Sequence, residues 1–192
     1  ASGWDVTICE ARSEAGGRAG ILREAGFVFD TGPSWYLMPE VFEHYFELLG
    51  EDINDYLDLA RLDPAYKVFF EDNTHMTIHA DLKRDSKTFD AIESGSGAKL
   101  REYVKRAEKT YKLAMQHFLY TNFSQSRKLF HPDILKSLPK LGGMLTTKID
   151  TYVKRFIQNP KLRQVLEYPM VFLGTSPFNA PAMYSLMSYL DF

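Results

Sequence analysis

The spacing of apolar and polar residues predicts two short β-strands near the start of the chain. Residues 6–10 form an apolar, partly β-branched run that ends in Glu10, and such a run is typical of a buried parallel strand. Cys9 lies inside this run, so we expect it to be a small buried side chain. Residues 21–30 contain Gly26 followed by the alternation Phe-Val-Phe-Asp, and this period of two indicates a second strand.

One amphipathic helix and one hairpin are predicted next. Pro39 begins the helix over residues 39–49 and Gly50 ends it, as is common for proline at the start and glycine just past the end of a helix. Strand-like runs at residues 66–70 and 76–80 are joined by a short polar turn, which is typical of a β-hairpin. This part of the chain is therefore predicted to mix helix and strand.

The second half of the chain is predicted to be mostly helical. Its strongest pattern runs from about Ala98 to Tyr120, where apolar residues recur every three to four positions. A short helical piece precedes it, and prolines separate further helical segments after it. These shorter segments fall near residues 87–92, 132–138, 145–157, 160–168 and 180–190. The order is a β-rich edge of the nucleotide-binding type, then a hairpin, then a helical region, which gives a fold class of α+β or α/β.

The composition is that of a folded soluble protein, with 45% hydrophobic and 25% charged residues. Aromatic residues reach 14%, which favours a generous core, with an apolar ligand cavity as the alternative. The net charge of −2 excludes a general nucleic-acid-binding character. A single cysteine allows no disulfide within the chain and fits a reducing compartment.

Charge is unevenly distributed along the chain. Residues 40–63 carry eight acids and one base, whereas residues 127–163 carry nine bases and two acids. A basic segment with interspersed apolar residues can dock on an anionic membrane surface, although a solvated helical face is the commoner explanation. No apolar run is long enough to span a bilayer and no signal peptide is recognised. We therefore expect a cytoplasmic protein that associates peripherally with membranes.

The polar residues after the first predicted strand indicate one side of a nucleotide pocket. A carboxylate such as Glu10, at the carboxyl edge of a parallel sheet, can accept hydrogen bonds from ribose hydroxyls. Gly16 and Gly17 let the backbone approach a ligand closely. Arg18 offers a planar fork of donors suited to a diphosphate, and Arg12 adds a second donor. Each residue alone is more simply a surface salt bridge or a turn, but the combination is specific.

A second glycine turn follows the second predicted strand. In the segment Asp30-Thr-Gly-Pro-Ser-Trp35, Gly32 permits a tight turn, the following proline stiffens it, and Trp35 supplies a flat wall. Taken alone, a rigid turn packed against the core explains these residues. Together with the Glu10–Arg18 segment they indicate a ligand site.

These segments together resemble a known family. Residues 6–18, Gly26 and residues 30–35 resemble the flavin-binding start of the amine oxidase and carotenoid desaturase superfamily. Further segments resemble bacterial-type phytoene desaturases and extend the resemblance over essentially the whole chain. These are residues 32–39, 61–64, 69–72, 172–177 and 181–187.

The resemblance implies an FAD enzyme that introduces double bonds into a long hydrophobic polyene by hydride transfer to the flavin. Seven positions would then contact the cofactor. They are Glu10 at the adenosine ribose, Arg12, Gly17 and Arg18 along the adenosine–diphosphate path, and Gly32, Ser34 and Trp35 near the flavin. The catalytic acid or base stays unidentified, and no metal site is expected.

The resemblance also implies a division of the chain into three parts. Residues 1–38 would be part of an incomplete Rossmann-like FAD-binding domain, residues 39–95 the start of a substrate-binding domain with a β-hairpin, and residues 96–192 a helical lid or membrane-facing region. The expected partners are the polyene and a membrane surface, and the oligomeric state stays open.

Two parts of the family pattern are missing from this chain. The glycine fingerprint that cradles the diphosphate at a helix N-terminus is absent, and so is the family's C-terminal half. Gly95 and Gly97 imitate the fingerprint, but Leu100 stands where its third glycine belongs. We therefore expect a piece of a longer enzyme that by itself binds FAD weakly or not at all and is inactive.

Other interpretations of the sequence stay open. A related flavoprotein of the same superfamily is one, such as a carotenoid isomerase, a retinol saturase-like enzyme or an amine oxidase. A non-catalytic helical module that binds lipid or protein through the basic segment is another. His75 and His79 lie on one face of a predicted strand, and an isolated pair of this kind is more often structural than metal-binding.

Overall fold

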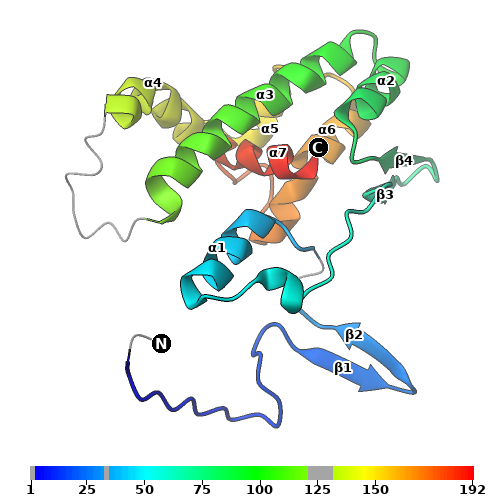
Figure 1. Cartoon of the computed structure of the whole chain (residues 1–192). Coiled ribbons are helices and arrows are strands. Elements are labelled where there is room, and N and C mark those ends of the chain that lie inside the picture. Colours follow the sequence, from blue (N-terminus) through cyan, green and yellow to red (C-terminus); the bar gives the residue numbers. More distant parts are fainter. Residues whose placement is uncertain (1–2, 33–34, 121–131) are drawn as a thin grey trace. The chain divides into compact units, whose positions relative to one another are not determined.

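The computed structural model describes residues 3–32, 35–120 and 132–192. The chain divides into two compact units, residues 1–59 and 60–192, which Figure 1 colours from blue to cyan and from cyan to red. Both tryptophans, Trp4 and Trp35, belong to the first unit. The predicted division at residues 38 and 95 concerns domains of a whole enzyme and stays a prediction.

The first unit contains a β-hairpin. Strands β1 (Ile21–Glu24) and β2 (Phe27–Asp30) pair in antiparallel fashion. Ala25 and Gly26 form the turn with φ values of 50° and 84°. Positive φ at both central residues gives a hairpin turn whose twist matches that of its strands, and glycine adopts it without strain. The predicted strand over residues 21–30 is therefore two strands, because Gly26 reverses the chain instead of continuing it.

The predicted strand at residues 6–10 is wrong. These residues have no regular secondary structure, and the side chains of Val6 and Ile8 are 63% and 87% exposed. A parallel strand needs hydrogen-bonded neighbours, and no described strand pairs with this segment. Cys9 is exposed rather than buried for the same reason.

Helix α1 (Pro39–Leu49) confirms the predicted helix of the first unit. Gly50 ends it in the left-handed conformation, with φ 78°, and its N–H donates to the Glu47 carbonyl. This is the usual way in which glycine terminates a helix. A single turn of 3-10 helix, η1 (Ile53–Asp55), follows.

The second unit begins with the predicted hairpin and continues with helices. Strands β3 (Tyr66–Phe69) and β4 (His75–Ile78) pair in antiparallel fashion. The elements that follow are α2 (Leu82–Ile92), α3 (Ser96–Ala114), the π-helical turn η2 (Met115–Leu119), α4 (Pro132–Thr146), α5 (Ile149–Val153), α6 (Pro160–Glu167), the 3-10 helices η4 (Tyr168–Leu173) and η5 (Ala182–Leu186), and α7 (Met187–Asp191). Each predicted helical region overlaps at least one of these elements.

In the second unit, α2, η5 and α7 pack against helix α3, and Figure 1 shows α2 and α7 beside this helix. Leu100 and Tyr103 on α3 are buried together with Phe89 of α2 and Val153 of α5. Burying each such side chain contributes about 1.5–3 kcal/mol. The periodic apolar stripe of the sequence is therefore the face that builds this core.

The mixed helix and strand content agrees with the predicted fold class. The described strands form two separate antiparallel pairs, and no parallel pair occurs among them. The Rossmann-like edge stays a prediction for this reason. In the part of the chain that the structure describes, no helix has the length and apolar character needed to cross a membrane.

Candidate functional site

The β1–β2 hairpin brings the two glycine turns of the first unit together. The Ala19 N–H donates to the Gly16 carbonyl at 2.9 Å, and the Thr31 N–H donates to the Gly20 carbonyl at 2.9 Å. Gly32 then lies directly against the backbone of Arg18. Two segments that the sequence suggested as one site are therefore neighbours in space.

Only glycine fits at the point of contact. A Cβ on Gly32 would collide with the carbonyl oxygen of Arg18 and would lie 2.9 Å from the Cα of Ala19. Both obstacles are backbone atoms, which cannot rotate away. Gly16 and Gly17 have φ values of 123° and 55°, which other residues adopt only with strain. The turn therefore presents bare backbone to its surroundings.

Glu10 and Arg12 form a second, local pair. The Arg12 N–H donates to the Glu10 Oε1 at 2.9 Å, so the carboxylate fixes the backbone direction just after the apolar run. Both residues are exposed. Among the described residues, the guanidinium groups of Arg12 and Arg18 make no ion pair and no hydrogen bond. Two cationic groups are thus available to an anionic ligand such as a diphosphate.

The remaining predicted cofactor residues are only partly placed. Ser34 lies outside the described residues. Trp35 is 38% exposed, and the neighbouring Tyr36 stacks its ring against Phe42 with centroids 4.6 Å apart. The structure joins Arg18 to Gly32 and Glu10 to Arg12. It shows no hydrogen bond or ion pair between these two pairs in the described part of the first unit.

Gly95 and Gly97 resemble the start of a glycine fingerprint before α3, and packing explains Gly97. The Gly97 N–H donates to the Asp90 Oδ1 at 2.9 Å, so a carboxylate of α2 already occupies this helix N-terminus. A Cβ on Gly97 would collide with the carbonyl oxygen of Ser86 and the Asp90 carboxylate. This glycine lets α2 and α3 approach closely, and it leaves no space for a phosphate.

The second unit contains an apolar pocket of about 540 Å³. Its walls come from α3, η2, α4 and η5, and include Leu113, Phe118, Ile134, Leu141, Met183 and Leu186. Its volume lies within the roughly 300–1,000 Å³ that is usual for small-molecule sites. The sequence indicated a substrate region after residue 96 but not these residues, because they meet only when three helical segments pack together.

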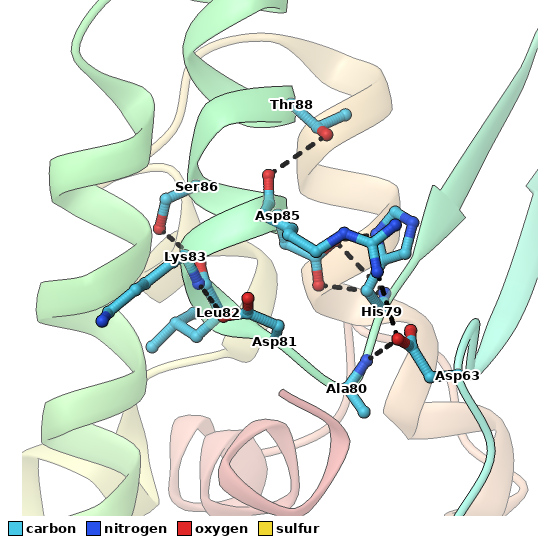
Figure 2. Close-up of polar contacts among 10 residues, drawn as sticks. Asp63, His79, Ala80, Asp81, Leu82, Lys83, Asp85, Ser86 and Thr88 are labelled. Atoms are coloured by element: carbon cyan, nitrogen blue, oxygen red, sulfur yellow. Dashed lines mark hydrogen bonds and ion pairs between the residues drawn. The ribbon is translucent and has the colours of Figure 1, made fainter.

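A buried polar pair lies at the end of β4. His79 donates its backbone N–H to both carboxylate oxygens of Asp85, at 3.2 and 3.1 Å, and its ring Nδ1 lies 2.8 Å from Oδ1 (Figure 2). Asp85 is fully buried. Burial raises the pKa of Asp85, and the hydrogen bonds from His79 oppose that rise. His79 therefore anchors α2 to the hairpin, which is a structural role.

A second, partly buried carboxyl group lies near this pair. The Tyr66 hydroxyl donates to the Asp191 Oδ2 at 2.6 Å and so links β3 to α7. Burial, with the nearby charge of Asp85, raises the pKa of Asp191 to about 6. Across the described residues no group of three or more acidic, histidine or cysteine side chains is placed to hold a metal ion.

Comparison with known proteins places this geometry in a family. The family model of flavin-containing amine oxidoreductases matches residues 1–192. The chain is 40% identical to a carotenoid 3,4-desaturase of Haloarcula japonica, over 100% of this chain and 38% of that protein. It is 34% identical to a phytoene dehydrogenase of Streptomyces griseus, over 99% and 37%. It is also 32% identical to a zeta-carotene-forming phytoene desaturase of Myxococcus xanthus, over 98% and 36%.

The chain spans less than two fifths of the length of these curated relatives. The match to the family model nevertheless runs from its first residue to its last. The chain with these paired glycine turns, exposed arginines and apolar pocket therefore belongs to the flavin-containing amine oxidoreductase family.

Proposed function

We propose that the full-length protein is an FAD-dependent carotenoid desaturase, which introduces C=C bonds into a long polyene. The observation that carries this proposal is the contact of Gly32 with the Arg18 backbone. This contact joins the two glycine turns into one backbone surface without side chains, next to the exposed residue Arg18. The three relatives compared above are named as a carotenoid desaturase, a phytoene desaturase and a phytoene dehydrogenase, and these names support the choice of substrate.

In this proposal the first unit is one edge of a Rossmann-like FAD-binding domain. Glu10 then accepts hydrogen bonds from the ribose. Arg12, Gly17 and Arg18 follow the diphosphate.

The residues of the second turn complete the proposed site. Gly32, Ser34 and Trp35 lie near the flavin ring, where the tryptophan excludes water. FAD, when bound, supplies the acceptor for a hydride from an allylic carbon. The contribution of the protein is to orient the polyene and to keep its surroundings apolar.

We also propose that the second unit receives the polyene from a membrane on the cytoplasmic side, with peripheral attachment. Leu135 and Leu145 on α4 are 44% and 54% exposed, and Lys136 directly follows Leu135 in the sequence. Exposed leucines next to cationic residues are typical of helices that lie in a membrane interface.

An FAD titration of the full-length protein tests the cofactor site. We expect Glu10→Ala and Arg18→Ala to weaken FAD binding at least tenfold, measured by calorimetry or by quenching of flavin fluorescence. Arg23→Ala is the matched control, because Arg23 is an exposed arginine on β1 outside both turns. Equal affinity in all four proteins would contradict the assignment of the turns to the cofactor.

A reaction with phytoene in liposomes tests the activity. The full-length protein with FAD is expected to produce more conjugated carotenes, which absorb at longer wavelength. Isomerised but not desaturated product, or oxidation of amines alone, would instead assign the protein to another activity of the family. Liposome binding without FAD that depends on Lys154 and Arg155 but not on Arg18, with no turnover, would favour an interaction module.

A further inference from the structure

Helix α4 contains two adjacent glycines in its interior, Gly142 and Gly143. Glycine weakens a helix relative to alanine. For both residues an added Cβ would meet nothing within 4 Å, and neither has positive φ. Neither close packing nor backbone conformation therefore requires these glycines. The two differ in one respect, since Gly142 lines the apolar pocket and Gly143 is not among the pocket residues.

The polar groups in the pocket wall are already hydrogen-bonded. The Thr110 hydroxyl donates to the Arg106 carbonyl at 3.1 Å, and the Gly142 carbonyl accepts from the Thr146 hydroxyl at 3.0 Å. The other lining residues in the described part of the chain have apolar side chains or, as with Gly142, none. Water needs two or more polar partners to be stable in such a space. A peptide segment would leave its own N–H and C=O groups without partners, and so would the polar edge of a flavin.

We infer that the pocket holds one hydrocarbon end of the polyene and that Gly142 determines which ends fit. The absence of a side chain at residue 142 leaves open the space between α4 and α3. The inference rests on the proposed function for the identity of the hydrocarbon. It adds a specificity-determining position to that function, because a larger residue at position 142 shortens the space without touching the flavin turns.

Binding of diphenylhexatriene tests this inference on the chain itself. The probe is a rod-shaped polyene hydrocarbon whose fluorescence rises in apolar surroundings, so it reports entry into the pocket without FAD. Gly142→Leu is expected to weaken its binding at least tenfold. Gly143→Leu, the matched control on the same helix, is expected to leave the affinity within twofold. Both variants should unfold at the wild-type temperature or above, because leucine is the better helix former.

Competition identifies the occupant. Squalene, a linear isoprenoid hydrocarbon, is expected to displace the probe from the wild-type chain. Equal probe affinity in the wild type and in Gly142→Leu would overturn the inference. Failure of the wild-type chain to bind the probe would overturn it as well, since the pocket would then be filled by the protein's own residues.

A kinetic test on the full-length protein separates this inference from the proposed function. We expect Gly142→Leu to raise the KM for phytoene while FAD affinity and kcat stay within twofold of the wild type. If the protein desaturates no carotene but Gly142→Leu still abolishes probe binding, the pocket assignment holds and the proposed function fails. If desaturation occurs and Gly142→Leu changes neither KM nor probe binding, the function stands and this inference fails.

Discussion

A single hydrogen atom in place of a methyl group lets Gly32 reach the backbone of Arg18. Gly32→Ala forces the Arg18–Ala19 backbone to move, because the added Cβ overlaps backbone atoms. We expect a loss of about 1–3 kcal/mol, which is typical of overpacking. Both tryptophans lie in the first unit, so urea unfolding followed by tryptophan fluorescence measures this effect.

Gly20→Ala is the control for that experiment. Its Cβ would lie 3.1 Å from the Thr31 Oγ1, an atom that can rotate away, so a much smaller change is expected. The helical signal of the second unit in circular dichroism should be the same in both variants. Equal destabilisation by the two substitutions would show that close approach at Gly32 is not what holds the turns together.

The raised pKa of Asp191 predicts that the stability of the chain depends on pH. Its pKa is raised to about 6, mainly by burial, from an ordinary value near 4. The folded state therefore favours the protonated carboxyl group. The free energy of unfolding is highest below a pH of about 4, and it falls as the pH rises through about 6 and the carboxyl group ionises. The groups that face it are Asp85, Tyr66 and Tyr168. The loss amounts to at most about 3 kcal/mol at pH 8.

Asp191→Asn removes this loss and keeps an oxygen that accepts from the Tyr66 hydroxyl. We expect the variant to melt at a higher temperature than the wild type at pH 8 and at the same temperature at pH 4. Glu167, whose pKa burial also raises to about 6, is present in both proteins and cancels. A difference in melting temperature that is the same at both pH values would contradict the burial of an ionisable Asp191.

At the scale of elements, Glu93 joins the end of α2 to the start of α6. Its Oε2 accepts from the backbone N–H groups of Gln158 and Asn159, at 3.0 and 2.7 Å. Burial alone would raise the pKa of Glu93, but these amides and Lys99 outweigh it and lower the pKa. Glu93→Ala leaves two amides without this acceptor. The expected loss is about 1.5–3 kcal/mol, measured by thermal unfolding in circular dichroism.

Glu102→Ala is the comparison for that measurement. Glu102 pairs with Arg106 one helical turn away on the exposed side of α3, and such pairs contribute only about 0.2–0.5 kcal/mol. If the two variants lost the same stability, the link between α2 and α6 would be no stronger than a surface ion pair.

Periodicity predicted the helices well because their apolar faces pack within the chain. Leu100 and Tyr103 recur at helical spacing and are buried, and Pro39 and Gly50 mark the ends of α1. The same reasoning failed for residues 6–10, since the stability of a parallel strand depends on neighbouring strands that the pattern does not contain. Whether a strand forms depends on the strands that hydrogen-bond to it, whereas a helix forms its backbone hydrogen bonds within its own segment.

At the scale of the whole molecule, the two units differ in how much core they contain. The buried apolar cluster is formed by residues of the second unit, from Met76 to Ala182. In the described part of the first unit, Ile53 is the one buried hydrophobic residue. We expect residues 60–192 expressed alone to give a helical spectrum and a cooperative thermal transition. Residues 1–59 alone should show less helix and unfold at a lower temperature, because they bury little apolar surface. A gradual, non-cooperative melt of 60–192 would contradict this picture.

The sequence indicated the two glycine turns because their residue types are specific, and the structure adds the contact between Arg18 and Gly32. It did not indicate the pocket residues. Leucine and phenylalanine at helical spacing look the same whether they face a core or a cavity, and Gly142 by itself looks like a weak helix position. Only the packing of α3, α4 and η5 distinguishes a filled interior from an open one.

The placement of the tryptophans has a spectroscopic consequence. Trp4 and Trp35 lie in the first unit, whereas the apolar pocket lies wholly in the second. A conjugated polyene seated in the pocket absorbs where tryptophan emits, so resonance energy transfer between them depends on the distance between the units. A conjugated ligand that enters the pocket would therefore act as an acceptor dye, and the tryptophan lifetime would report its occupancy.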